Sequence, residues 1–373
     1  MAGIYIHIPF CKQACTYCDF HFSTTFEAYR KEMIDCIIQE IVSSKSSFLD
    51  QDITTIYFGG GTPSLLLENE LNAIITTIFK HYNVCENPEI TLEANPDDIN
   101  MKALQIWKKN NINRLSIGVQ SFDNEDLAWM NRAHRSEEAI QAIQLAKKMN
   151  FLLTVDLIYG LPNSNLEKLE KNLDKLVELA PEHISCYCLT VEEKTVLHNQ
   201  QKNNLIQLPG EEHQAQQFLT VVAYLEKAGY LQYEISNFAK DGHFAQHNSN
   251  YWKMIPYLGF GPSAHSFIPP RRRWNVAANR KYIQLLSKNE NHFEEELLTD
   301  KELLNEAIMT GLRTIWGFDL ANWQTKTQIH KDFFTQINTF KSAGWIKEEN
   351  GKITLTKQGK LRADYIASEL FQL

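Results

Sequence analysis

Short apolar segments alternate with amphipathic segments through the first half of the chain, and this alternation predicts the fold. The apolar segments have the length and the β-branched content of buried strands, and the amphipathic segments carry apolar residues at helical spacing. The six predicted strands are Ile4–Ile8, Ile53–Phe58, Glu89–Leu92, Arg114–Val119, Leu152–Ile158 and His183–Leu189. The predicted helices include Phe26–Val42, Leu65–Phe79, Ala139–Met149 and Leu166–Leu179. Strands and helices that alternate in this way indicate parallel βαβ units of the α/β class.

The polar residues after these strands help to choose between two architectures, an open doubly wound sheet and a partial barrel. Four of the strands are followed by polar or Gly-Pro loops, which are Gly59–Pro63, Glu93–Pro96, Gln120–Asp123 and Gly160–Pro162. A barrel builds its site from the loops after many strands, whereas an open sheet uses mainly the crevice at its switch point. We therefore expect a partial (β/α)6 barrel of the TIM type, with its site at the carboxyl ends of the strands.

The second half of the chain has a different pattern. A helical segment, Gln214–Ala228, precedes an aromatic- and glycine-rich stretch that runs from His243 to Trp274. From Leu297 onward, two helices, a short hairpin and a last helix, Lys357–Phe371, predict an α+β module of the winged-helix type. We divide the chain into a barrel (1–240), a connecting segment (241–296) and this C-terminal module (297–373). The module has mixed charges, so we expect it to pack against or cover the barrel rather than bind DNA.

Composition narrows the class of protein. A barrel with an appended module fits a chain of 373 residues, of which 43% are hydrophobic and 22% charged. The formal net charge of −8 argues against a broad basic surface, so we expect no nucleic-acid partner. No apolar stretch approaches the roughly 20 residues of a membrane helix, and the N-terminus does not resemble a signal peptide. We expect a cytoplasmic protein without an integral membrane segment.

Three of the seven cysteines, Cys11, Cys15 and Cys18, lie in one loop directly after the first strand. Three thiolates in a tight loop can hold a [4Fe–4S] cluster and leave one iron open. Structural zinc, with His7 or His21 as a fourth ligand, and free thiols remain alternatives at this point. Cys186 and Cys188 share one face of a predicted strand and are expected to pack in the core.

The C-x3-C-x2-C spacing resembles the signature of radical S-adenosylmethionine (radical SAM) enzymes. The flanking strings, Tyr5–Cys11 and Tyr17–Phe20, are similar to the branch that includes oxygen-independent coproporphyrinogen III dehydrogenase and the HemW heme chaperones. The resemblance covers essentially the whole chain. It implies that the barrel is a radical SAM core, and that Cys11, Cys15 and Cys18 hold a [4Fe–4S] cluster. S-adenosylmethionine would then chelate the open iron through its methionyl amine and carboxylate.

The same resemblance implies which residues contact S-adenosylmethionine. The glycine motif would meet the methionyl amine, because small residues let backbone carbonyls approach an ammonium closely. A carboxylate suits ribose hydroxyls or a sulfonium, and an arginine fork suits a carboxylate. The positions that match are Tyr5, Tyr17, Gly60, Gly61, Thr62, Glu93, Gln120, Arg132 and Asp156. His7, just before the cysteine loop, is expected to support that loop through a hydrogen bond.

Two features distinguish the dehydrogenases of this branch from the heme chaperones. The dehydrogenases have a fourth cysteine and a longer N-terminal extension, whereas here Phe20 stands at the fourth position and ten residues precede Cys11. The segment His247–Trp252 matches the H-N-x-x-Y-W motif that the HemW resemblance associates with heme. Histidine is a common axial ligand of heme iron, and aromatic rings stack on a macrocycle. A packed turn is the alternative interpretation of this segment.

These features favour a heme chaperone that binds heme, with His247 as the iron ligand, and transfers it to apo-hemoproteins. The expected cofactors are a [4Fe–4S] cluster, S-adenosylmethionine and heme, and no catalytic residue is assigned. The alternative function is an oxygen-independent coproporphyrinogen III dehydrogenase, a radical SAM decarboxylase. A winged-helix regulator with a redox-sensing cluster has little support. Whether the chain forms a homodimer stays open.

Overall fold

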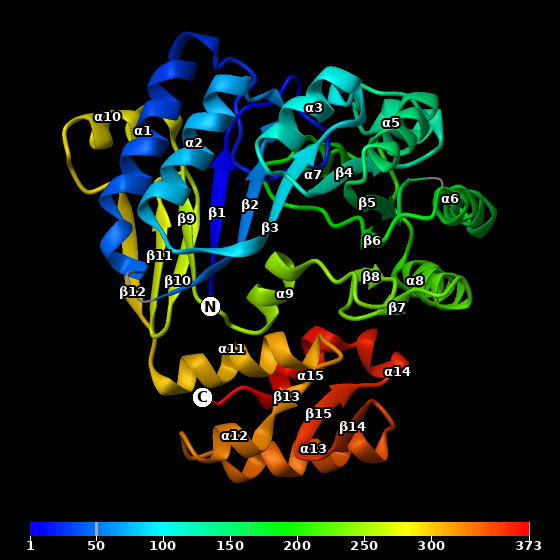
Figure 1. Ribbon diagram of the computed structural model, residues 1–373. Helices are drawn as coiled ribbons and strands as arrows, with labels where there is room; N and C mark the ends of the chain where they lie inside the picture. The colour runs from blue at the N-terminus through cyan, green and yellow to red at the C-terminus, as the bar shows by residue number, and fades with distance from the viewer. Residues whose placement is uncertain (49–50, 163, 373) are drawn as a thin grey trace.

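Six parallel strands form the centre of the computed structural model, which describes residues 1–48, 51–162 and 164–372. These strands are β1 (Ala2–Ile8), β2 (Ile53–Gly60), β3 (Val84–Ala94), β4 (Arg114–Gln120), β5 (Leu152–Tyr159) and β6 (His183–Cys188). Each pairs in parallel with the next in sequence order, as Figure 1 shows. In the described residues the sheet has two free edges, β12 and β7, so it does not close. The predicted six-unit partial barrel is confirmed.

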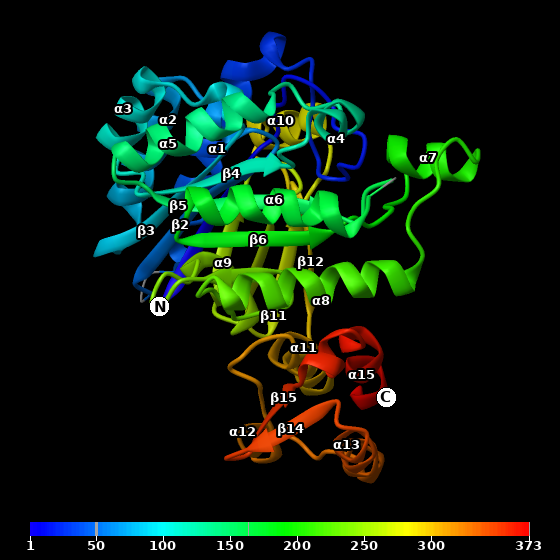
Figure 2. The ribbon, with the colours of Figure 1, turned by 90° about the vertical axis from the view of Figure 1, so that its right-hand side faces the viewer.

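Helices cover the outer face of these strands (Figures 1 and 2). They are α1 (Arg30–Ser43), α2 (Glu68–His81), α3 (Met101–Lys109), α5 (Ser136–Lys148), α6 (Leu166–Leu179) and α8 (Glu211–Lys227). The patterns predicted all of these except α3. They also missed the short helices α4 (Asn124–Trp129) and α7 (Val196–Lys202). Helices of two turns or fewer present too few apolar repeats to be recognised by periodicity.

Helix α6 shows why the longer helices could be predicted. The side-chain oxygen of Asn165 accepts a hydrogen bond from the Lys168 backbone N–H and caps the first turn. The helix ends at Ala180, which adopts a left-handed conformation with φ of 48°. Between these ends, apolar residues such as Leu169 and Leu173 recur every three to four positions and are buried against the sheet.

The stretch after residue 240 extends the same sheet. Strand β9 (Tyr257–Phe260) pairs in parallel with β1, and three antiparallel strands follow it: β10 (His265–Ile268), β11 (Arg271–Asn275) and β12 (Phe293–Leu297). Strands β7 (Leu231–Gln232) and β8 (Asn237–Ala239) continue the opposite edge beyond β6. This stretch also contains α9 (Gln246–Trp252) and α10 (Asn279–Ser287). The predicted domain boundaries after residues 240 and 296 stay a prediction, and the sheet runs across the first of them.

A buried carboxylate ties this extension to the barrel. Glu40 of α1 is fully buried and accepts hydrogen bonds from the Gly261 backbone N–H (2.9 Å) and the Asn275 amide (2.8 Å). The hydroxyl of Tyr282 donates to it at 2.5 Å, and the ring of His292 lies at 3.1 Å. Because a buried charge without partners would destabilise the fold by several kcal/mol, these four contacts make Glu40 a fixed junction between α1 and the loop after β9.

A second hydrophobic core lies in the C-terminal part, below the sheet in Figures 1 and 2. Its elements are α11 (Asp300–Leu312), β13 (Phe318–Asp319), α12 (Leu320–Gln324), α13 (Lys331–Ser342), β14 (Ile346–Glu349), β15 (Lys352–Leu355), α14 (Lys357–Lys360) and α15 (Ala363–Leu370). The predicted order of helices and hairpin is present, with the last helix divided into α14 and α15. Among the described residues, none of the helices is both long and apolar enough to span a membrane.

Candidate functional site

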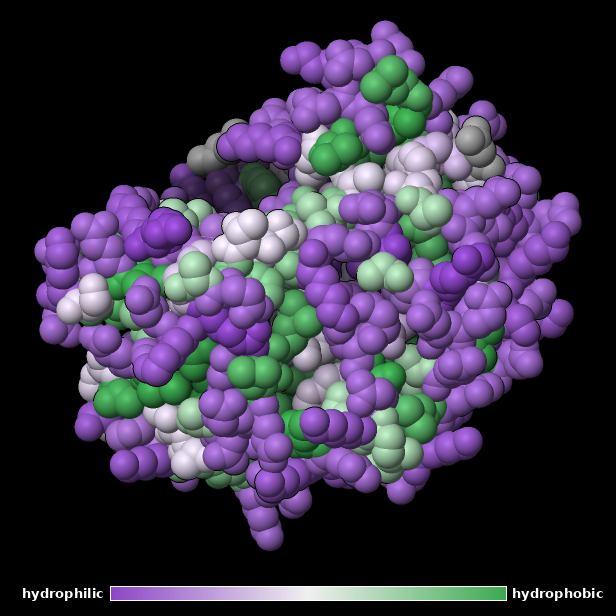
Figure 3. All heavy atoms as spheres, turned by 90° about the horizontal axis from the view of Figure 1, so that it is seen from above, coloured by the Kyte–Doolittle hydropathy of each residue, from purple (hydrophilic) through white to green (hydrophobic). Residues whose placement is uncertain are grey.

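The three clustered cysteines lie in the loop that follows the carboxyl end of β1. Cys11, Cys15 and Cys18 are free thiols that line a cavity of about 760 Å³. Figure 3 shows the molecule from above, where the surface is hydrophilic over most of its margin and hydrophobic side chains gather in patches between. The two histidines that zinc would need as a fourth ligand, His7 and His21, line a neighbouring cavity and not this one.

Polar groups already surround the thiols. The Thr62 hydroxyl donates to the sulfur of Cys11 (3.4 Å), and the Arg132 guanidinium donates to that of Cys15 (3.3 Å). Burial raises the pKa of Cys11 to about 11 and that of Cys18 to about 12. These thiols are therefore protonated at neutral pH until iron displaces the protons. In the described residues, no three His, Cys, Asp or Glu side chains are gathered as ligands of a single metal ion would be. Three separate soft thiols beside two cationic or hydroxyl donors fit a thiolate-bound cluster.

The glycine turn after β2 lies against the cysteine loop. Gly60 has a φ of 104°, and a Cβ there would lie 2.6 Å from the ring of His7. A Cβ on Gly61 would lie 2.7 Å from the carbonyl oxygen of Phe10. Both positions therefore require glycine, one for its conformation and both for close approach. The ring of His7 lies 2.8 Å from the carbonyl oxygen of His21, so the predicted support of the cysteine loop by His7 is confirmed.

Two carboxyl groups line the same cavity and form no ion pair with any residue that the structure describes. Glu93, at the end of β3, accepts a hydrogen bond from the Tyr57 hydroxyl (2.8 Å), and burial raises its pKa to about 7. Asp156, on β5, accepts from the Ser116 hydroxyl (3.4 Å), and burial raises its pKa to about 6. Carboxyl groups that are desolvated but unpaired are typical of ligand sites, because a cationic or hydroxyl-bearing ligand completes their bonding.

Arg132 and Gln120 carry two further signs of a ligand site. The Arg132 guanidinium donates to the side-chain oxygen of Asn95 (2.6 Å) and to the carbonyl of Gly118 (2.7 Å). Its Nε is buried and has no hydrogen-bond partner among the described residues. Gln120 has a φ of 68°, in the left-handed region, where the pairing of β4 with β5 shifts register. Unsatisfied donors and strained backbone are found together mainly at functional sites.

The cavity thus brings together most of the residues that the sequence predicted as contacts of S-adenosylmethionine. Tyr17, Gly60, Gly61, Thr62, Glu93, Gln120, Arg132 and Asp156 all line it. Tyr5 lines the neighbouring cavity instead, where its hydroxyl lies 3.1 Å from the ring of His7. The sequence analysis missed Asn95, Ser116, Ser185, Tyr187 and Asp364 as lining residues. Cys188 was predicted to pack in the core, but it lines this cavity, whereas Cys186 is buried.

The C-terminal part contributes directly to this cavity through Asp364, which lies on α15. Its carboxylate forms an ion pair with Arg313, at the end of α11. The expectation that the C-terminal module covers the barrel therefore has a contact that supports it. No sequence pattern indicated Asp364, because an isolated acidic residue on an amphipathic helix is usually a solvated one.

A second cavity of about 480 Å³ adjoins the first. Its walls are rich in imidazole and phenol rings: His7, His21, His265, Tyr5, Tyr57, Tyr251 and Tyr257 all line it. Phe20 lines both cavities, and 67% of its surface is exposed. Phe20, which takes the place of a fourth cysteine, is therefore one of the residues that the two cavities share, together with residues such as Tyr57 and Glu93.

His247 lies in neither cavity. It is 1% exposed, its Nδ1 lies 2.8 Å from the Thr55 hydroxyl, and its Nε2 lies 2.8 Å from the Tyr251 hydroxyl. Its ring is stacked on Tyr57, with centroids 5.1 Å apart. The next residue, Asn248, lines both cavities. The packed conformation, which the sequence left as an alternative, is the one in this structure, and heme ligation by His247 stays a prediction that requires a hydrogen bond to break.

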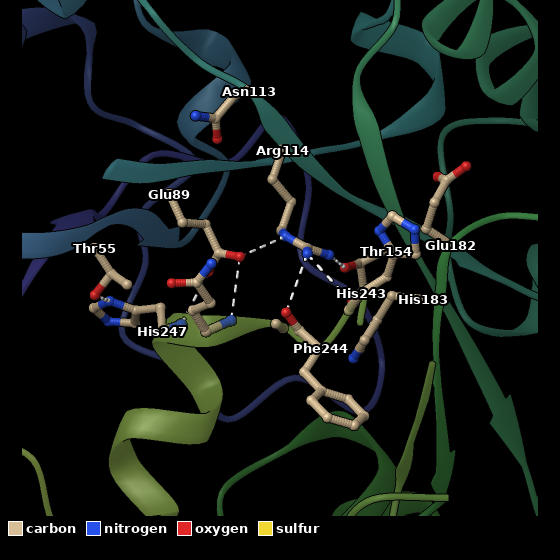
Figure 4. Close-up of polar contacts among 12 residues, drawn as sticks. Thr55, Glu89, Asn113, Arg114, Thr154, Glu182, His183, His243, Phe244 and His247 are labelled. Atoms are coloured by element: carbon tan, nitrogen blue, oxygen red, sulfur yellow. Dashed lines mark hydrogen bonds and ion pairs between the residues drawn. The ribbon is translucent and has the colours of Figure 1, made fainter. Parts of the chain in front are cut away.

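A buried ion pair holds the start of α9, as Figure 4 shows. The Arg114 guanidinium donates to Glu89 at 2.9 Å, and both side chains are at most 4% exposed. Arg114 also donates to the carbonyl of Phe244 (3.2 Å), while Glu89 accepts from the backbone N–H groups of Gln246 (3.1 Å) and His247 (2.9 Å). No sequence pattern indicated this pair, because residues so far apart in the chain leave no local signal.

Comparisons with known proteins agree with this geometry. Residues 5–176 match the radical SAM superfamily, and residues 298–362 match the HemN C-terminal domain. A protein named heme chaperone HemW from Bacillus subtilis (strain 168) is 34% identical over 366 residues, which are 97% of each chain. One of the same name from Buchnera aphidicola subsp. Acyrthosiphon pisum (strain APS) is 35% identical over 96% of this chain and 95% of its own.

Among solved structures, coproporphyrinogen III oxidase (HemN) from Escherichia coli superposes with a TM-score of 0.87. The match covers 100% of this chain and 90% of that one, at 22% identity, so it shows a shared fold. The full-length relatives carry more weight, because they match both the barrel and the C-terminal part. The chain therefore belongs to the radical SAM superfamily and, within it, to the family of the heme chaperone HemW.

Proposed function

We propose that this protein is a heme chaperone, which binds heme beside a [4Fe–4S] cluster and S-adenosylmethionine and transfers the heme to apo-hemoproteins. The observation that carries this proposal is the meeting of two cavities at Phe20. One holds three thiols and unpaired carboxyl groups, and the other is walled by imidazole and phenol rings. The first suits a cluster with a polar, charged ligand, and the second suits a flat apolar macrocycle with a coordinating metal.

Each residue of the first cavity has a role in this proposal. Cys11, Cys15 and Cys18 would hold the cluster, which supplies an electron at this end of the barrel when it is bound. Arg132 would bind the carboxylate of S-adenosylmethionine with its unpartnered Nε. Glu93 and Asp156 would accept from its amine or hydroxyl groups, and these contacts would favour their ionised forms. Gly60, Gly61, Thr62, Gln120 and Tyr17 would shape the rest of the site.

The alternative is decarboxylation of coproporphyrinogen III. The shared fold with HemN permits it, since fold alone does not decide activity. Phe20 opposes it, because this residue, which lines both cavities, stands where the dehydrogenases carry a fourth cysteine. The carrier function is therefore the better supported of the two.

The experiment that tests the proposal follows anaerobic reconstitution with iron and sulfide. The protein is titrated with hemin, and the heme-loaded protein is then mixed with apomyoglobin as a model acceptor. We expect saturable hemin binding followed by the absorption spectrum of holomyoglobin. A parallel sample receives reductant, S-adenosylmethionine and coproporphyrinogen III. Formation of protoporphyrinogen IX, together with failure to bind hemin, would overturn the proposal in favour of the decarboxylase.

A further inference from the structure

We propose that the axial ligand of the heme iron is His265, the first residue of β10, which lines the aromatic cavity. This inference rests on the proposed heme-binding function and deepens it, because it places the iron at one atom of one side chain. It also moves the iron away from His247, whose ring is buried and hydrogen-bonded on both nitrogens.

The hydrogen bonds of the candidate imidazoles separate them clearly. His7 bonds through both ring nitrogens, to the Tyr5 hydroxyl and to the carbonyl of His21. His21 bonds through Nε2 to the side-chain oxygen of Asn279 at 2.7 Å. In the part of the chain that the structure describes, the ring of His265 makes no hydrogen bond, and the residue is exposed. An iron ligand must offer a free nitrogen lone pair, and His265 offers one without the loss of an existing bond.

The surroundings of His265 keep its ring neutral and oriented. Its partial removal from water and the nearby Arg272 guanidinium lower its pKa, so the imidazole is unprotonated at neutral pH. The ring stacks on Trp274, its register partner on β11, with centroids 6.4 Å apart and planes 29° apart. A neutral imidazole that is held against an indole is available for coordination at little entropic cost.

The backbone of His265 is also fixed in place. A Cβ on Gly259 would lie 2.0 Å from the His265 carbonyl oxygen, so β9 and β10 approach each other closely at this point. The Ser266 hydroxyl accepts a hydrogen bond from the Gly259 backbone N–H (2.9 Å) and is buried. The turn between the two strands includes Gly261, whose N–H donates to the buried Glu40. A rigid turn thus holds an unbonded imidazole at the wall of the cavity.

Other rings that line this cavity are suited to the macrocycle. Tyr57 and Tyr251 belong to the aromatic group around α9, and Phe20 lies at the border with the cluster cavity. Aromatic faces stack on a porphyrin and shield it from water, and such stacking contributes on the order of 1 kcal/mol for each ring. Heme on His265 would therefore occupy a cavity that shares Phe20 with the cavity of the three cysteines.

Hemin titration monitored by absorption tests this inference. The proteins are the wild type, His265→Ala, His21→Ala, and His81→Ala as a control on α2, outside both cavities. We expect at least a tenfold weaker Kd for His265→Ala and loss of the spectrum of imidazole-ligated heme. We expect free imidazole to restore that spectrum, because it can occupy the space of the missing ring. The control His81→Ala should match the wild type, and His21→Ala should keep the spectrum of imidazole-ligated heme, because His21 lines the cavity without ligating the iron. Cluster reconstitution of each variant checks that it folds.

Each remaining outcome has a distinct meaning. If His265→Ala binds hemin with the affinity and spectrum of the wild type, the iron ligand lies elsewhere and this inference is wrong. If His21→Ala instead loses the spectrum of imidazole-ligated heme, the assignment of the iron ligand to His265 is also wrong. If the wild type itself binds no hemin, the proposed function fails, and the defect is not specific to His265.

Discussion

Two glutamates on one strand, Glu89 and Glu93 of β3, lie four residues apart and have opposite surroundings. Glu89, at the middle of the strand, receives the Arg114 guanidinium and two backbone N–H groups in a buried network (Figure 4). Glu93, at the carboxyl end, faces the cluster cavity and forms no ion pair with any described residue; burial raises its pKa to about 7. A buried charge with complete partners stabilises an architecture, whereas a buried charge without them awaits a ligand.

The histidines repeat this contrast. Both ring nitrogens of His247 are hydrogen-bonded within the protein. The ring of His265, by contrast, lines a cavity and makes no hydrogen bond with any described residue. The motif that contains His247 nevertheless reaches this region, because Asn248, the next residue, lines both cavities. The predictions below test this difference between satisfied and open groups.

The largest effect should follow the loss of a cluster thiol. We expect Cys11→Ala, Cys15→Ala or Cys18→Ala each to reduce the iron retained after anaerobic reconstitution to background, because two thiolates do not hold a cubane. The measurement is iron and sulfide content per chain. Cys188→Ala is the matched control, since Cys188 lines the same cavity and should leave the iron content unchanged. Iron retention by the Cys18→Ala protein would show that the cluster assignment is wrong.

The second effect concerns the buried ion pair of Arg114 and Glu89. Arg114→Met leaves Glu89 buried without its cation, and breaking a buried pair in this way costs about 3–5 kcal/mol of unfolding free energy. Urea denaturation at neutral pH measures the loss. The double variant with Glu89→Gln should recover part of it, because the unpaired charge is then removed. A loss below about 1 kcal/mol in the single variant would mean that the network is not the anchor described here.

The third effect concerns Glu93, at the cluster cavity, and depends on pH. The pKa of Glu93 in the folded protein, about 7, is above its ordinary value of 4.5, so the folded state binds more protons between these values. Its contribution therefore makes the protein less stable as pH rises from about 4.5 to about 7. We expect Glu93→Gln to gain stability over the wild type by about 1–3 kcal/mol at the upper end of this window and to show no gain below it.

Urea denaturation at several pH values in this range measures the difference in unfolding free energy between the wild type and Glu93→Gln. This difference separates the titration of Glu93 from that of the buried histidines. Burial lowers the pKa of His7 and His134 to about 4, and these groups destabilise the fold as pH falls. They are present in both proteins, so their contribution cancels in the difference. An equal difference at every pH would show that Glu93 does not titrate in this range. The same variant should bind S-adenosylmethionine more weakly, which a structural carboxylate would not cause.

The sequence predicted the parts of this fold that have local causes. Helix α6 was predicted with its observed bounds, because a cap, an apolar repeat and a left-handed residue mark it within a few residues. The cysteine loop and the Gly60 turn were predicted for the same reason. The strands β9 to β12 were missed as strands, since they are four or five residues long and one of them consists of three arginines, a tryptophan and an asparagine.

The features that could not be predicted depend on residues far apart in the chain. The Arg114–Glu89 pair, the four contacts of Glu40 and the entry of Asp364 into the cavity arise only when separate elements pack together. The sequence motif around His247 likewise indicated an aromatic site, but the motif does not show that Nδ1 of His247 is hydrogen-bonded to Thr55, which is remote in the chain. Periodicity describes faces of elements, and it says nothing about which faces meet.

The smallest effect should follow the substitution Asp364→Asn in the C-terminal part, which we expect to cover the barrel. The carboxylate of Asp364 is 83% exposed, so its ion pair with Arg313 contributes less than about 1 kcal/mol to stability. Because Asp364 also lines the cluster cavity, we expect the affinity for S-adenosylmethionine to change by a few fold while the urea midpoint stays within error. Isothermal titration of the reconstituted protein measures the affinity, and Asp332→Asn, exposed on α13 of the same body, is the control. Equal affinities in all three proteins would remove the C-terminal part from the ligand site and leave it a packing role alone.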